Sequence, residues 1–240
     1  MRPPRPASIA LAALLGAAAG CERGRDAPAV DRALIAIGDR PTLRTDTIGV
    51  DRFESQATFV LADAQNLADV DAEVTIGGIL VDADGREVAP LRPESLRIPA
   101  HGKRTFALID RGRAARPTAV AARLDVRGAR QPRFPEPVTI GDGHIYKDGD
   151  RAVVTGMVTN TTDRALVAIV LAGFHDASGA PMTRPFAAFE LGGGASRPTR
   201  FVGPDGSRAA YIFVGDVTFC PRSGCEVTHA APALPPPAAP

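Results

Sequence analysis

The feature that most constrains the fold of this chain is a long internal repeat. The segment NLADVDAEVTIGGILVDADG, at 66–85, aligns without a gap with NTTDRALVAIVLAGFHDASG, at 160–179. Asn66 aligns with Asn160 and Gly85 with Gly179, at a constant offset of 94 residues. A chain of 240 residues is long enough for two small domains. The repeat therefore predicts two copies of one folding unit.

The repeated segment has the two-residue period of a half-buried strand. Apolar residues alternate over 74–80 and again over 168–174, between turn sequences rich in Asn, Asp and Gly. Further strands are predicted over 57–63, 95–99, 104–109 and 120–126 in the first copy, and over 151–159, 187–191, 199–203 and 209–217 in the second. Many short strands with turns between them indicate an all-β fold of two tandem β-sandwiches.

Composition agrees with this and narrows the function. The chain has 22 prolines, 24 glycines, no tryptophan and only 5% aromatic residues, which favours short elements over long packed helices. The formal net charge is +1, and loss of residues 1–20 would remove two arginines and no acid. A chain so close to neutrality offers no electrostatic argument for binding nucleic acid.

The first 20 residues have the pattern of a secretory signal peptide. Two arginines precede an apolar run over 7–19, which is too short to span a bilayer as a helix. The sequence AAGC at 18–21 resembles the lipobox of bacterial lipoproteins, with Ala18 where that family usually has leucine. The resemblance implies cleavage before Cys21 and lipid on its sulfur. The alternative is an ordinary signal peptidase cut that leaves Cys21 as a thiol.

Two cysteines, Cys220 and Cys225, remain if Cys21 carries lipid. Export implies an oxidising compartment, where a pair separated by a Pro-Arg-Ser-Gly turn is expected to form a structural disulfide. A zinc site is the less favoured alternative, because structural zinc needs four ligands and only His229 lies nearby. A redox pair would more typically have C-x-x-C spacing.

The repeat also resembles the small immunoglobulin-like domains of bacterial lipoproteins, the FxLYD type. GILVD at 78–82 and AGFHD at 172–176 keep the aspartate and the apolar residue two before it, but lack the phenylalanine and tyrosine. The resemblance implies immunoglobulin-like sandwiches and a binding role. The expected layout is a signal peptide at 1–20, a flexible tether at 21–53 with one short ordered piece at 33–38, domain 1 at 54–127, a linker at 128–140, domain 2 at 141–226 and a disordered Pro/Ala-rich tail at 227–240.

No catalytic, metal or cofactor site is predicted. The four histidines, His101, His144, His175 and His229, have no metal-pair spacing, and His175 is expected to be a solvated residue on the outward face of its strand. The acidic stretches at 82–85 and 142–150 suit hairpin turns better than calcium, because no glutamate stands at the EF-hand distance. The glycines at 192–194 lack the lysine of a phosphate loop.

The expected function is that of a non-catalytic binding or scaffolding module, held by lipid on Cys21 and partnered by another envelope protein. Glu22 follows Cys21 where an aspartate would retain an enteric lipoprotein at the inner membrane, so the periplasmic face of the outer membrane is the expected location. The alternative is an accessory lipoprotein that binds a small ligand or metal between the two domains. That alternative predicts a pocket lined by polar residues from both copies.

Overall fold

The computed structural model describes residues 27–48, 54–221 and 225, and these form the predicted all-β sandwich fold. Apart from the short 3-10 turn η1 (Arg32–Leu34), their regular structure is antiparallel strand. The first half contains β1 (Ile35–Ile37), β2 (Thr42–Ile48), β3 (Ser55–Asn66), β4 (Ala72–Val81), β5 (Glu87–Pro90), β6 (Glu94–Ile98), β7 (Lys103–Ile109) and β8 (Ala121–Arg130). The second contains β9 (Val138–Asp148), β10 (Arg151–Asn160), β11 (Leu166–His175), β12 (Pro181–Thr183), β13 (Phe186–Leu191), β14 (Ser196–Val202) and β15 (Ala209–Phe219).

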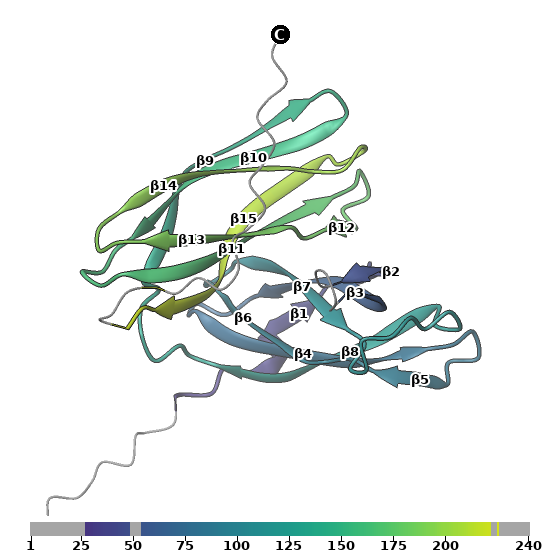
Figure 1. The fold of residues 1–240 in the computed structure, drawn as a ribbon. Helices are drawn as coiled ribbons and strands as arrows, with labels where there is room; N and C mark the ends of the chain where they lie inside the picture. Colours follow the sequence, from purple (N-terminus) through teal and green to yellow (C-terminus); the bar gives the residue numbers. More distant parts are fainter. Residues whose placement is uncertain (1–26, 49–53, 222–224, 226–240) are drawn as a thin grey trace, which may run out of the picture.

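Each half is a pair of facing sheets with the same strand arrangement (Figure 1). In the first sandwich, β3 lies between β7 and the successive edge strands β1 and β2, while β4 lies between β8 and the pair β5 and β6. In the second, β10 lies between β9 and β14, while β11 lies between β15 and the pair β12 and β13. Strand β9 therefore takes the place that β1 and β2 share in the first copy.

The predicted inward faces form the two cores. Val74, Ile76 and Leu80 of β4 are fully buried in the first sandwich, and the alternate residues 168–174 of β11 are buried in the second. Burial of one side of each strand supplies the hydrophobic free energy that fixes strand register, because a one-residue slip would turn every apolar side chain outward.

The repeated asparagines have the same structural role in both sandwiches. Asn66 donates from its amide to the carbonyls of Val70, Ile98 and Pro99, and its side-chain oxygen accepts from the Ala68 N–H. Asn160 makes the equivalent set of bonds in the second copy. Both side chains are fully buried. Each amide therefore joins two turns at the same end of its sandwich.

The predicted tether at 21–53 needs correction over 35–48. These residues form β1 and β2, which pair along most of the length of β3. Many side chains of β1 and β2 are exposed, and polar and apolar residues do not alternate along these strands. The two-residue period that would predict a strand is therefore weak there. The first sandwich thus begins earlier in the chain than expected.

The boundary between the sandwiches is also tighter than expected. Strand β8 extends to Arg130 and β9 begins at Val138, so only 131–137 connect the two sandwiches instead of the predicted 128–140. The predicted signal peptide at 1–20 and the predicted tail at 227–240 lie outside the described residues. No helix among the residues that are described is long and apolar enough to cross a membrane.

The two sandwiches stack on each other, so that four sheets lie in successive layers (Figure 1). The outer face of the sheet centred on β3 meets the outer face of the sheet centred on β11. Leu171 of β11 and Phe213 of β15 are buried in the core cluster of the first sandwich. Strand β11 is consequently buried on both of its faces.

Candidate functional site

The contact between the two sandwiches, here called the joint, is the most unusual part of the molecule. Its centre is a close approach of two sheets at Gly173. A Cβ atom added there would lie 2.6 Å from the Thr105 hydroxyl oxygen and 3.2 Å from the Tyr211 ring. Only glycine leaves room for the opposing sheet, because real Cβ atoms do not approach other atoms so closely. The absence of a side chain at this position lets polar groups from both sandwiches meet.

A polar cluster, the Asp63 cluster, lies beside Gly173, with some members buried, some half-buried and one, Lys103, exposed. The Asp63 carboxylate accepts from the Thr105 hydroxyl at 2.7 Å, from the His175 Nε2 at 2.9 Å and from the Lys103 ammonium at 3.0 Å. The Tyr211 hydroxyl donates to the same carboxylate at 3.2 Å, and its ring stacks on the His175 imidazole. Three of the five side chains come from the first sandwich and two from the second.

The environment of this cluster fixes the charge of its carboxylate. Burial by itself raises the pKa of Asp63, but the hydrogen bonds from His175, Thr105 and Lys103 and the charge of His175 outweigh it and lower the pKa to about 2. Burial raises the pKa of the Tyr211 hydroxyl, and the neighbouring Asp63 charge raises it further. The cluster therefore holds an ionised carboxylate beside a protonated phenol.

A second polar contact crosses the joint at Arg184. Its guanidinium binds both carboxylate oxygens of Glu94, at 2.7 and 3.0 Å, and donates to the Thr105 carbonyl at 3.0 Å. The other Glu94 interaction is with the backbone N–H of Ala107. The Arg184 side chain is only 10% exposed. Bidentate, desolvated ion pairs of this kind fix relative orientation more strongly than surface pairs do.

The edge strand of the first sandwich also reaches the second. Arg44 of β2 donates to the Met182 carbonyl at 2.7 Å, and Arg40 donates to the Ser178 carbonyl. Both carbonyls belong to the β11–β12 hairpin and the strand after its turn. These contacts extend the joint from the Asp63 cluster to the break between β1 and β2.

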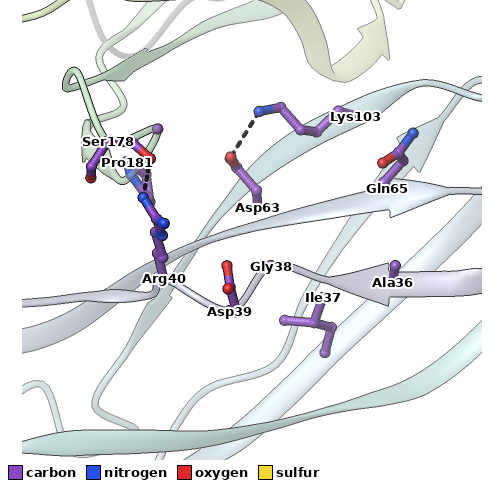
Figure 2. Close-up of a pocket in the computed structure, with 11 residues that line it drawn as sticks. Ala36, Ile37, Gly38, Asp39, Arg40, Asp63, Gln65, Lys103, Ser178 and Pro181 are labelled. Carbon is purple, nitrogen blue, oxygen red and sulfur yellow. Dashed lines mark hydrogen bonds and ion pairs between the residues drawn. The ribbon is translucent and has the colours of Figure 1, made fainter.

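A cleft of about 330 Å³ opens at this break, and we call it the joint cleft. Figure 2 shows Arg40 reaching across to Ser178 and Lys103 turned toward Asp63. The lining comes from both sandwiches and is predominantly polar: Ala36, Ile37, Gly38, Asp39, Arg40, Asp63, Gln65, Lys103, Ser178, Gly179 and Pro181. Its size lies at the lower end of the range for small-molecule sites.

The two groups of the Asp63 cluster with shifted pKa values, Asp63 and Tyr211, are poorly suited to acid–base chemistry near neutral pH. Asp63 is saturated with donors and its pKa lies far below neutrality, so it is a weak base. Tyr211, with a raised pKa, keeps its proton. Within the described residues there is no group of three or more His, Cys, Asp or Glu side chains that could hold a metal ion.

The predicted site residues fall outside this joint. Cys21, the predicted lipidation site, lies outside the described residues. Cys220 and Cys225 are joined by a disulfide, with Cα atoms 4.8 Å apart, which closes the loop after β15. The acidic turn at Asp82 uses its carboxylate to accept from the N–H groups of Asp84 and Arg86, which is the turn role expected for it.

The prediction for His175 is wrong. Its side chain points away from its own core, as the strand parity indicates, but it is only 2% exposed because the first sandwich covers that face. Asp63, Glu94, Arg184 and Tyr211 were missed for a related reason: no spacing in the sequence brings them together. The one available signal is that β11 is apolar on both faces, which indicates a strand buried on both sides.

Comparison with known proteins does not assign the chain to a family. No family model matches it, and no curated protein does. Among solved structures it is similar to a red sea bream transglutaminase, at 11% identity and a TM-score of 0.23. That match covers 74% of this chain and 30% of the other. A likeness this distant says nothing about activity.

Fold and site together define a class. The chain is an all-β protein of two stacked sandwiches, with a polar joint that buries charged side chains and a cleft at its edge.

Proposed function

We propose that this protein is a lipid-anchored module of the bacterial cell envelope that works by binding or scaffolding. The observation that carries the proposal is the joint. Two sandwiches held by the Glu94–Arg184 ion pair, by the hydrogen bonds of the Asp63 cluster and by shared apolar packing present one fixed surface to a partner, as a scaffold must. The lipobox-like AAGC sequence at 18–21 supplies the anchor in this proposal, and the disulfide suits an oxidising compartment.

The anchor is tested by metabolic labelling. The full-length protein is expressed in a Gram-negative host with an alkyne analogue of palmitate, and membranes are separated. The wild type is expected to carry label in the outer-membrane fraction, and Cys21→Ser is expected to lose it. The Cys220→Ser/Cys225→Ser double variant is the control and should stay labelled. Absence of label from the wild type, or label that survives Cys21→Ser, contradicts the anchor.

The binding role is tested at an open sheet edge. Strand β9 is an edge of its sheet, and Ile145 on it is 57% exposed. Free edges are templates for a partner strand. A photo-crosslinking residue at Ile145, and in separate variants at Val120 and Phe186, should give a discrete adduct with one envelope protein from at least one position. No adduct from any position in the native envelope contradicts the role.

A second candidate function is binding of a small polar molecule in the joint cleft. It is favoured by one observation, the convergence of Asp39, Arg40, Gln65 and Lys103 with the Ser178 turn. Asp39 and Gln65 make no hydrogen bond among the described residues through their side chains, so both are open to a ligand. Backbone NMR shifts confined to residues 36–40 and 178–181, on addition of polyols or sugars, support it. Shifts that are absent or scattered over both sandwiches contradict it.

A further inference from the structure

A second cavity lies between the sandwiches, behind the connecting segment 131–137, and we call it the linker pocket. Its volume is about 200 Å³, the share of roughly seven water molecules. It is lined by Asp71, Arg97, Pro99, Arg104, Glu136, Val138, Ile140, Ile212, Phe213 and Val214. The charged residues come from the first sandwich and the connecting segment, and the aliphatic residues come from β9 and β15. The pocket thus has one polar end and one apolar wall.

Two of the charged residues at the polar end, Arg97 and Asp71, form a hydrogen-bonded frame around the pocket. Arg97 donates two hydrogen bonds to one oxygen of Asp71, at 2.6 and 3.1 Å, and the other oxygen accepts from the Ala100 N–H. Arg97 also donates to the Phe134 carbonyl at 2.9 Å, which fastens the connecting segment over the pocket. These groups are mutually satisfied, so the frame holds the shape of the pocket.

The remaining charged pair, Arg104 and Glu136, is not satisfied in this way. The two charges interact electrostatically, but no hydrogen bond or ion pair joins them in the described part of the chain. Arg104 donates one N–H to the Lys103 carbonyl, and its guanidinium lies over the Phe213 ring. Its Nε is buried and has no hydrogen-bond partner among the described residues. Burial lowers the pKa of Arg104 and raises that of Glu136. Both charged forms are therefore short of solvation and would gain from a polar ligand.

The wall opposite these charges is branched aliphatic. Val138 is buried in the core of the second sandwich, and Ile140, Ile212 and Val214 pack against that core. Phe213 closes the pocket on the side of the first sandwich. A ligand that fills this space gains hydrophobic free energy in proportion to the apolar area it buries.

From this arrangement we propose that the linker pocket binds a small zwitterion with an apolar side chain, the chemical class of valine and leucine. The ligand carboxylate lies against Arg104, its ammonium lies against Glu136, and its side chain lies on the aliphatic wall. A simple carboxylic acid fits less well, since it can bind Arg104 but brings its charge near Glu136 and supplies no cation to that carboxylate. A simple amine would in the same way face Arg97 and Arg104. A ligand with a carboxylate and an ammonium at the same end gives Arg104 and Glu136 each an opposite charge.

The experiment is a titration of the purified full-length protein in detergent with L-leucine, followed by calorimetry and by backbone NMR. Isovalerate, isoamylamine and glycine are the ligand controls, because each lacks one of the three matched groups. L-Leucine is expected to bind with shifts at residues 136–140 and 212–214, and each control to bind at least about tenfold more weakly. Equal binding of L-leucine and isovalerate, or no saturable binding at millimolar concentration, overturns the proposal.

Two variants make the assignment to this pocket specific. Glu136→Gln keeps the size of the side chain and removes the charge that holds the ammonium, so it should weaken L-leucine binding by about tenfold and leave isovalerate unaffected or improved. Asp39→Asn makes the same kind of change in the joint cleft and should leave L-leucine affinity unchanged. Circular dichroism checks that both variants fold. An equal loss of affinity in the two variants, with both folded, overturns the assignment.

Discussion

Asn66 and Asn160 are buried amides that occupy the same place in the two sandwiches. Each one donates to a backbone carbonyl in the turn after its own strand and to a second carbonyl 33 or 32 residues further along the chain. Buried carbonyls need such donors. Three carbonyls depend on each amide. The Pro99 and Gly192 carbonyls also accept from a backbone N–H, but loss of the amide removes several buried hydrogen bonds at once. This is a larger penalty than the loss of a single average hydrogen bond.

Asn66→Ala is therefore expected to lower the free energy of unfolding by about 3 kcal/mol. Chemical denaturation followed by circular dichroism measures this. Gln65→Ala is the matched control, because Gln65 is the neighbouring amide, exposed and without a side-chain hydrogen bond among the described residues. Its effect should be within about 0.5 kcal/mol of zero. Similar losses for the two variants would show that the buried amide has no special role.

Asp63 gives the joint a dependence on acid. Its pKa in the folded protein is about 2, below the ordinary value of 3.8. A depressed pKa means that the stabilisation is fully present above the unfolded-state value and is lost as pH falls through the folded-state value. The stabilisation that the Asp63 charge provides is therefore expected to be lost between about pH 4 and pH 2.

Comparison of the wild type with Asp63→Asn tests this dependence. The difference in unfolding free energy between them should shrink by about 2 kcal/mol between pH 4 and pH 2. Urea denaturation at a series of pH values measures it. A difference that stays constant across this window would mean that the Asp63 charge does not support the joint.

At the scale of strands and sheets, the four central strands were predictable, and so were the edge strands β6, β7, β8, β13, β14 and β15. The edge strands β2 and β9 were not. Strands β3, β4, β10 and β11 bury alternate residues, and this pattern is visible in the sequence. Strands β2 and β9 are edges whose side chains are largely exposed, so no apolar period marks them. They are defined by pairing with β3 and β10, which is a tertiary property that local sequence does not encode.

The joint was unpredictable for a different reason. The outward parity of His175 was readable from β11, and the one local sign that another sheet covers that face is that β11 is apolar on both of its faces. Asp63 and His175 are 112 residues apart, and Glu94 and Arg184 are 90 apart. The disulfide was predictable because its partners are five positions apart in sequence, on either side of a Pro-Arg-Ser-Gly sequence whose composition is typical of turns.

Gly173 is the position where one strand controls the distance between the two sheets of the joint. Gly173→Ala should lower the free energy of unfolding by about 1–3 kcal/mol, because the new methyl group overlaps the buried Thr105 hydroxyl. Gly128→Ala in β8 is the control, since a Cβ there meets nothing within 4 Å. It should be neutral or slightly stabilising. Thermal denaturation of both variants measures the contrast, and equal effects would remove the steric explanation.

At the scale of the whole molecule, the two sandwiches are expected to unfold as one cooperative body. Arg184 supports this through its bond to Glu94, whereas Arg86 forms an exposed ion pair with Asp84 at the same 2.7 Å distance. Arg184→Met should cost about 3 kcal/mol and separate the calorimetric unfolding into two transitions. Arg86→Met should cost less than about 1 kcal/mol and leave one transition. A single unfolding transition in Arg184→Met, with unchanged stability, would show that the Arg184–Glu94 ion pair is not needed to hold the two sandwiches together.

A joint that fixes the two sandwiches relative to each other makes the protein one rigid body in solution. Residual dipolar couplings of backbone amides, measured in one weak alignment medium, test it most directly because they report the orientation of each strand in solution. One alignment tensor should fit β1–β8 and β9–β15 together, with the relative orientation of Figure 1. Two tensors of clearly different magnitude, one for each sandwich, would mean that the sandwiches move independently and that the joint does not fix them.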